Sequence, residues 1–270
     1  MGLKRNAKGE LIEVSPLRTR KGSIYLRGTN EIFKVSRSKF SNFLDCPRCF
    51  YLERVKGLKD PGMPGWALNS AVDELLKKEF DHYRKIQKPH PFVVKNKLNY
   101  IPFQHEQLDH WRDALRGGIA FTDSDTNLEI HGGVDDIWFN PDNKELIVVD
   151  YKAQSKEGTV ETVDYLENQY HQGYKIQMDI YVYILRQMKF KVSDTAYFFV
   201  CNGLKTTDKF DALLHFDLAL VPYKTDTSWV KDKIKDMKKT LESKDVPEIN
   251  KFCEKCLYLE GGSNLIRDAI

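Results

Sequence analysis

The segment GGVDDIWFNPDNKELIVVDYK, from Gly132 to Lys152, consists of two apolar runs separated by a Pro-Asp-Asn-Lys turn. Runs rich in Val, Ile, Trp and Phe on either side of such a turn predict a β-hairpin. Pairing about the centre of the turn places Ile137 opposite Val148 and Asp135 opposite Asp150. Opposite Cβ atoms lie roughly 4.5–5.5 Å apart, and like charges at that distance destabilise the pairing. The sequence therefore predicts that a cation lies between the two carboxylates.

Lys152 follows Asp150 by two residues and lies on the same face of its strand, which adds an ammonium group to the predicted site. The other face of the hairpin is apolar, with Val134, Trp138, Ile147 and Val149. A sheet with two apolar faces usually has helices on both of them. We therefore expect an α/β fold with this hairpin at its centre and a cleft at its polar end.

A second interpretation of the same residues is a surface salt bridge between Asp135 and Lys152, which contributes about 0–1 kcal/mol. This interpretation accounts for the lysine. It does not account for two carboxylates at the end of a hairpin that is apolar on both faces, so we favour the metal site.

The chain has 270 residues, of which 41% are hydrophobic and 12% aromatic, as in globular proteins. The net charge is +3, but residues 1–40 contain ten Lys or Arg against three Asp or Glu. We expect a basic N-terminal extension over residues 1–35, which is compatible with a polyanionic partner, although basic tails are also common without one. No apolar run approaches the ~18 residues of a membrane span, and no signal peptide is recognisable. We therefore expect no membrane partner and a cytoplasmic location.

Helical periodicity predicts a helix over 66–86, on which Asn69 and Asp73 share a face, and another over 164–188, on which Gln177 and Tyr181 share a face. Either pair can also belong to an ordinary helix surface. The apolar stripe of the first helix contains Leu68, Val72, Leu75, Leu76 and Phe80. Shorter helices are predicted from Ser36, over 105–116 and over 228–241, and strands over 118–122, 128–139, 145–152, 195–201 and 212–220.

Two Cys-x-x-Cys pairs lie near opposite ends of the chain, at Cys46 and Cys49 and at Cys253 and Cys256. Four thiolates are suitable ligands for Zn²⁺ or for an iron–sulfur cluster, and the spacing alone does not decide between them. The alternative is four unrelated buried thiols. Cys201 lies within an apolar strand and is expected in the core.

The order of three motifs resembles the PD-(D/E)XK nuclease superfamily, and most of all its RecB-like and CRISPR-adaptation exonuclease branch. The motifs are Gly65-x-x-x-Asn69-x-x-x-Asp73, then Gly132-x-Val-Asp135 with Val148-Val-Asp150-x-Lys152, then Gln177-x-x-x-Tyr181. The resemblance covers residues 36–256. It implies a three-layer α/β/α restriction-endonuclease-like core with a mixed central sheet, elaborated by N-terminal helices and by the cysteine site. We expect one nuclease domain over 36–256, closed by the four cysteines, and a C-terminal tail over 257–270.

The resemblance also implies a divalent-metal-dependent DNA nuclease, acting as an exonuclease or on single strands and duplex ends. Asp135, Asp150 and the Tyr151 carbonyl then bind Mg²⁺ or Mn²⁺, with Asn69 and Asp73 as further ligands. Lys152, Gln177 and Tyr181 complete the catalytic set, and Trp66 is a candidate for stacking on unpaired bases.

The first motif differs from the family at Asn69, where relatives have histidine. An amide oxygen favours harder ions such as Mg²⁺, but the substitution is also compatible with a catalytically silent nucleic-acid-binding module. A subunit of a helicase–nuclease complex is a third interpretation.

The resemblance favours a [4Fe–4S] cluster at the cysteines, because several relatives hold one. Those relatives have one cysteine before the core and three after it. Two lie on each side here, which keeps zinc as the alternative.

Overall fold

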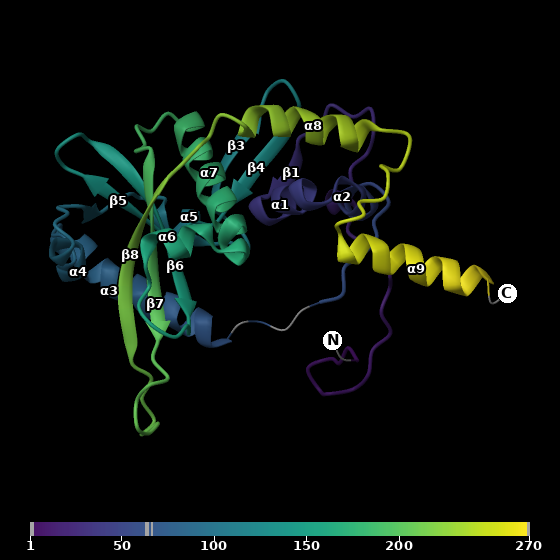
Figure 1. Ribbon diagram of the computed structural model, residues 1–270. Helices are drawn as coiled ribbons and strands as arrows, with labels where there is room; N and C mark the ends of the chain where they lie inside the picture. Colours follow the sequence, from purple (N-terminus) through teal and green to yellow (C-terminus); the bar gives the residue numbers. More distant parts are fainter. Residues whose placement is uncertain (1–2, 63–64, 66, 269–270) are drawn as a thin grey trace. The chain divides into compact units, whose positions relative to one another are not determined.

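The computed structural model describes residues 3–62, 65 and 67–268 (Figure 1). Contacts within the chain separate two compact units. Unit 1 contains residues 1–65, 122–130 and 231–270, and unit 2 contains residues 66–121 and 131–230. The expected single domain over 36–256 stays a prediction, because a division by contacts does not test whether each unit folds independently.

Unit 2 is built on a five-stranded sheet in the order β2-β5-β6-β7-β8. The strands are β2 (Ile101–Pro102), β5 (Asp136–Asn140), β6 (Glu145–Gln154), β7 (Thr195–Gly203) and β8 (Phe216–Lys224). The pair β6–β7 is parallel and the other three pairs are antiparallel. The sheet is therefore mixed, as the family resemblance implied.

The central hairpin of this sheet has the predicted register. Ile137 pairs with Val148 and Phe139 with Leu146, and Lys144 N–H donates to Asn140 O at 2.9 Å to close the turn. The last pair of the ladder joins Asp136 to Val149, so Asp135 lies one residue before the strand begins.

Helices cover both faces of the sheet. Adjacent residues of a strand point to opposite faces, and Phe198 and Phe199 of β7 show which helix covers which face. Phe199 contacts Phe80 of α3 (Ala67–Ile86), with ring centroids 5.4 Å apart. Phe198 contacts Tyr165 of α6 (Thr162–Glu167) and Tyr174 of α7 (Gln172–Gln187). The core therefore has the expected three α/β/α layers.

The predicted apolar stripe of α3 is correct only in part. Leu76 and Phe80 are buried and Val72 packs against the same core, but Leu68 and Leu75 are 63% and 64% exposed. The buried face consists of residues four apart, at Val72, Leu76 and Phe80. Leu75 lies beside this face and not on it. Leu68 continues the series, but residues 67–71 are all exposed.

Two predicted elements are interrupted. The expected strand over 128–139 is β4 (Leu128–Gly132) followed by β5, with a break at residues 133–135. The expected helix over 164–188 is α6, a 3₁₀ turn (Gln169–His171) and α7, and the Asn168 side chain caps that turn by accepting from Tyr170 N–H. The helix expected around Trp111 is shorter, as α5 (Leu108–Arg112), and α4 (Pro91–Lys95) precedes it.

Unit 1 contains β1 (Phe33–Ser36), α1 (Arg37–Asp45), α2 (Pro47–Arg54), most of α8 (Val230–Glu242) and α9 (Glu254–Asp268). Strand β1 joins a three-stranded sheet in the order β1-β4-β3, in which β3 (Ile119–Asp123) and β4 carry the chain from one unit into the other. Ser36 caps α1, as predicted. The N-terminal segment is largely irregular, with a 3₁₀ turn (Lys21–Ser23).

Within the described residues, no helix is both long and apolar enough to span a membrane.

Replacement of Phe80 by alanine should destabilise unit 2 by about 3–5 kcal/mol, because it leaves a cavity among large buried side chains. Phe80 is 0% exposed and stacks on Trp138 with ring centroids 5.3 Å apart. The control is Leu75→Ala on the same helix, which should change stability by less than about 0.5 kcal/mol. Urea unfolding of the three proteins measures the difference, and equal unfolding curves would contradict this description of the core.

Candidate active site

The structure places Asp135 and Asp150 at the same end of the central hairpin. Asp150 is 1% exposed within β6, whereas the Asp135 side chain is about one-quarter exposed. Asp135 Oδ2 accepts from the backbone N–H of Tyr151 at 2.9 Å, which fixes this carboxylate against the strand that carries Asp150. Burial, together with the neighbouring charge of Asp150, raises the pKa of Asp135 to about 7. Two carboxylates have thus been brought together at an electrostatic cost.

Lys152 compensates part of this cost by forming an ion pair with Asp150. Its Nζ also lies 4.5 Å from the ring centroid of Tyr174 on α7. Burial by itself would lower the pKa of Lys152, but the charges of Asp150 and Asp135 outweigh burial and raise it. The lysine therefore stays an ammonium group beside the two carboxylates.

Helix α7 supplies two polar side chains one turn apart. Gln177 Nε2 donates to Asp150 Oδ1 at 2.6 Å. The Tyr181 hydroxyl donates to the Gly133 carbonyl at 2.6 Å and accepts from Gln177 Nε2 at 3.4 Å. The two residues predicted on this helix thus hold the strand end from which Asp135 projects and orient the carboxylate of Asp150.

Helix α3 brings Asp73 and Lys77 near Asp135. Asp73 Oδ2 accepts from Lys77 Nζ at 2.8 Å, and that Nζ lies 3.9 Å from Asp135 Oδ1. Asp73 Oδ1 is buried and has no hydrogen-bond partner among the described residues. Burial and the charge of Asp135 raise the pKa of Asp73. Asn69 is exposed and donates to the Ala153 carbonyl at 3.3 Å, beside the end of β6.

Lys77 was not identified from the sequence. Its spacing of four residues from Asp73 indicates an ion pair on a helix, but nothing local indicates its approach to Asp135. The predicted Trp66 lies outside the described residues.

Asp136 was also missed, although it is fully buried. It forms ion pairs with Arg84 and Arg112, accepts from the Tyr151 hydroxyl at 2.8 Å, and accepts from Trp138 Nε1 at 3.3 Å. These arginines therefore neutralise Asp136 on the α3 face of the sheet and do not fill the space between Asp135 and Asp150.

Close backbone packing explains the glycines before Asp135. A Cβ on Gly133 would lie 2.8 Å from the Cα of Ala114. Gly118 has φ of +103°, and a Cβ there would lie 2.7 Å from the Gly132 carbonyl carbon. A larger residue at either glycine would therefore displace backbone next to the site.

The donor set is suitable for a hard divalent cation. The neighbouring carboxylates are Asp135, Asp150 and Asp73, and Mg²⁺ and Mn²⁺ prefer such oxygen ligands. In the part of the chain that the structure describes, their oxygens do not all lie within 4.8 Å of one another. The side chain of Tyr151 points away, into the core. A role for its carbonyl therefore concerns the backbone alone and stays a prediction.

The four predicted cysteine ligands lie together in unit 1. Sulfur atoms of Cys46, Cys49 and Cys256 lie within 4.8 Å of one another, and Cys253 Sγ is 3.9 Å from Cys49 Sγ. All are free thiols. Burial raises the pKa of Cys46 and Cys49, so their thiolates need a cation. Three of these sulfur atoms are placed so that they could hold a metal ion. Cys201 is buried in the core of unit 2, as expected.

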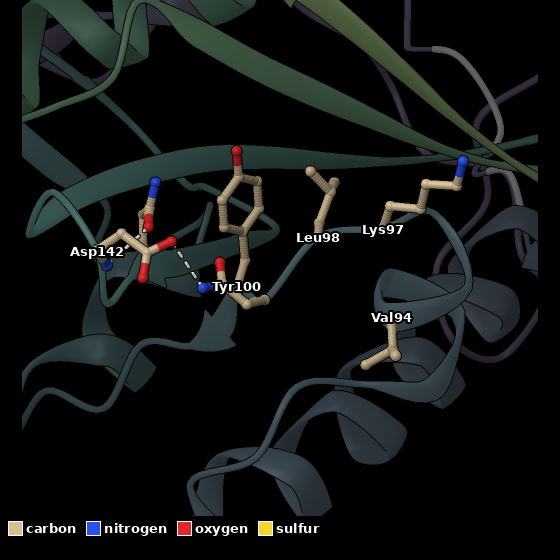
Figure 2. A pocket seen from close by; sticks show the side chains of 7 residues that line it. Val94, Lys97, Leu98, Tyr100 and Asp142 are labelled. Atoms are coloured by element: carbon tan, nitrogen blue, oxygen red, sulfur yellow. Dashed lines mark hydrogen bonds between the residues drawn. The ribbon is translucent and has the colours of Figure 1, made fainter.

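A shallow cavity of about 440 Å³ lies at the opposite end of the central hairpin (Figure 2). Its lining includes the turn residue Asp142 together with Tyr100, Val94, Lys97 and Leu98. Asn99 Nδ2 donates to Asp142 Oδ2 at 2.8 Å. The cavity is separated from Asp135 and Asp150 by the length of the hairpin and is not part of the carboxylate site.

A family model described as the PD-(D/E)XK nuclease superfamily matches residues 34–260. Among solved structures, the fold is similar to a crystal structure from Eubacterium rectale named "Putative exonuclease", with 12% sequence identity, a TM-score of 0.39, and coverage of 83% of this chain and 86% of that one. No curated protein matches significantly.

Replacement of Gly133 by alanine should destabilise the protein by about 1–3 kcal/mol, because the new methyl group overlaps backbone atoms of Ala114. The matched control is Gly173→Ala on α7, where an added Cβ meets no atom within 4 Å. This control should be neutral or slightly stabilising, since alanine favours helices. Urea unfolding of both variants measures the contrast, and a Gly133 variant as stable as the control would show that the close approach is absent.

Proposed function

Because the chain belongs to the PD-(D/E)XK nuclease superfamily, whose substrate is nucleic acid, we propose that unit 2 is a divalent-metal-dependent DNA nuclease that hydrolyses phosphodiester bonds. The observation that supports this proposal best is the convergence of Asp135, Asp150, Lys152 and Gln177 at one end of the sheet. A structural role alone does not require two neighbouring carboxylates, one of which has its pKa raised to about 7 by burial and by the charge of the other.

In this proposal Asp135, Asp150 and the Tyr151 carbonyl hold Mg²⁺ or Mn²⁺, with Asp73 and Asn69 as further ligands. When bound, the ion would lower the pKa of a coordinated water and would offset negative charge on the scissile phosphate. Gln177 holds the Asp150 carboxylate in place by its 2.6 Å hydrogen bond.

We propose that Lys152 orients the attacking water or stabilises negative charge on the phosphate oxygens. Its ammonium group is held by Asp150 and lies against Tyr174, so it is already positioned before substrate binds. Tyr181 acts on the backbone that precedes Asp135 through its bond to Gly133. We propose single strands or duplex ends as the substrate, with exonuclease action.

We further propose a [4Fe–4S] cluster at Cys46, Cys49, Cys253 and Cys256, with Zn²⁺ as the alternative. The supporting observation is the convergence of four free thiols from α2, from α9 and from the residues that precede these helices. Five free cysteines also support a cytoplasmic location, where thiols stay reduced. A helicase is a proposed partner.

Asn69 favours a second function, a silent nucleic-acid-binding module. Its amide nitrogen donates to the Ala153 carbonyl, so the side chain contacts the end of β6. Labelled single-stranded DNA incubated with Mg²⁺, Mn²⁺ or EDTA separates the two functions. Cleavage with either metal supports the nuclease, whereas retarded but uncut DNA in all three conditions supports the binding module.

Replacement of Lys152 by alanine should lower the cleavage rate about 10²–10³-fold, the usual cost of removing one group that stabilises charge in the transition state. The control is Lys191→Ala, because Lys191 is exposed and pairs with Glu145 at the far end of the hairpin. Initial rates on labelled single-stranded DNA, with circular dichroism to check the fold, measure the effect. A folded Lys152 variant that cleaves as fast as the control would refute this catalytic assignment.

Replacement of Cys256 by serine should remove the bound metal and destabilise unit 1, because metal binding is coupled to folding. Cys201→Ala is the control, since Cys201 lies in a different core and its loss should leave the metal content unchanged. Iron, zinc and acid-labile sulfide are measured on anaerobically purified protein. Iron with sulfide supports the cluster, zinc alone supports the alternative, and identical metal content in both variants would contradict the four-cysteine site.

A further inference from the structure

The hairpin formed by β7 and β8 begins at the edge of the sheet that carries the carboxylates. Strands β6 and β7 are parallel, so their carboxyl ends lie at the same edge. Asp150 pairs with Phe198, and Lys152 pairs with Val200. Strand β7 continues to Gly203, and the connecting loop over 204–215 then extends beyond the end of β6 (Figure 1).

The base of this hairpin is firmly held. Asn202 is fully buried, accepts from Lys156 N–H at 2.8 Å and donates to the Lys156 carbonyl at 3.0 Å. Ser155 Oγ donates to the Gly203 carbonyl at 2.7 Å. The loop that follows β6 is thus tied to the hairpin, and the orientation of the hairpin is coupled to the strand that carries Asp150.

The tip of the hairpin is unusually apolar for an exposed loop. Phe210 is 74% exposed, Leu213 is 61% exposed and Leu214 is 43% exposed. Leu213 N–H donates to Phe210 O at 2.8 Å, which closes the turn between them, and Asp211 and Ala212 within that turn both have positive φ. Two successive non-glycine residues in this conformation are costly, and the result is a turn that displays Phe210.

We propose that this tip binds unpaired bases of the substrate strand, with Phe210 as the stacking side chain. The inference rests on the proposed nuclease function and adds a second contact, remote from the bond that is cut. Aromatic side chains stack on bases of any sequence, which suits an enzyme that degrades strands without sequence preference.

The small size of the apolar tip favours bases over a protein partner. A large aromatic side chain has about 150–250 Å² of surface that can be buried. With the exposed fractions given above, the three side chains together expose on the order of 300–400 Å². A stable protein interface needs roughly 800 Å² on each partner. One or two stacked bases fit the smaller area.

Charges along the hairpin are compatible with a substrate DNA strand that runs from the carboxylate site to the tip. Lys156 and Lys205 are both exposed near the base of the hairpin, and such side chains bind backbone phosphates. Lys209 next to Phe210 pairs with Asp211 at 2.8 Å, so it adds little net charge at the tip. The tip is therefore suited to nucleobases, and the start of the hairpin, near Lys156 and Lys205, is suited to phosphates.

The position of the tip sets a minimum length for the substrate. Five residues separate Phe198, opposite Asp150, from Gly203, which corresponds to roughly 17 Å at 3.3–3.4 Å per residue. A strand with stacked bases rises about 3.4 Å per nucleotide. It therefore reaches the start of the loop only after about five nucleotides, and the tip lies further still.

The test measures the affinity for fluorescein-labelled oligothymidylates in EDTA, so that no strand is cut. Wild type, Phe210→Ala, Phe210→Leu and Phe210→Trp are compared by fluorescence anisotropy. Leu115→Ala is the control, because Leu115 is 94% exposed elsewhere in unit 2. We expect the alanine and leucine variants to bind a 20-mer about 5- to 100-fold more weakly, and the tryptophan variant to bind it like wild type. A 5-mer should show no difference among the proteins.

Equal affinity of all variants for the 20-mer, while wild type still cleaves DNA, would overturn the inference and leave the nuclease proposal intact. An equal loss with the 5-mer and the 20-mer would also overturn it, since a 5-mer held at the carboxylate site is too short to reach the tip. A wild-type dimer that Phe210→Ala dissociates, detected by light scattering, would identify the tip as a self-contact instead. Failure of wild type to bind or cleave any strand would overturn both proposals.

Discussion

The alternation of side chains along β5 gives two adjacent aspartates opposite environments. Asp136 points to the α3 face, where two arginines, a tyrosine and a tryptophan satisfy it in a fully buried position. Asp135 precedes the ladder and lies toward Asp150 instead. Removal of one partner from a buried ion pair leaves an uncompensated charge that costs several kcal/mol. The arginine pair therefore holds the Asp136 carboxylate on the α3 face, while Asp135 accepts from Tyr151 N–H beside Asp150.

The remaining electrostatics of the site are only partly balanced by the chain's own cations. Lys152 pairs with Asp150, and Lys77 approaches both Asp73 and Asp135. Burial and neighbouring carboxylates nevertheless raise the pKa of Asp135 and of Asp73. Divalent cations reverse this situation because they stabilise the ionised form of each oxygen ligand. The arrangement is costly for a structural ion-pair network and suitable for a metal site.

Much of this could be predicted from local sequence. The turn between two apolar runs defines the hairpin register, so the meeting of Asp135 and Asp150 follows from counting along the chain. Partners distant in sequence could not be predicted in this way. Arg84 is 52 residues from Asp136 and Arg112 is 24 residues from it, and no periodicity links them. Periodicity also misassigned Leu68, because it indicates the apolar side of a helix but not where the covering sheet ends.

The parallel pairing of β6 and β7 links the chemistry to the way the chain is connected. Parallel neighbours cannot be joined by a tight turn, so the chain must cross one face of the sheet between them. That crossing consists of α6 and α7, and α7 brings Gln177 to Asp150 and Tyr181 to Gly133. The same connection makes both strands end at one edge, so that β7 leaves the sheet beside the site and turns back only at an apolar tip. A β6–β7 hairpin would have supplied neither the polar helix nor the projecting loop. The crossover therefore accounts for the second half of the site and for the additional surface beside it.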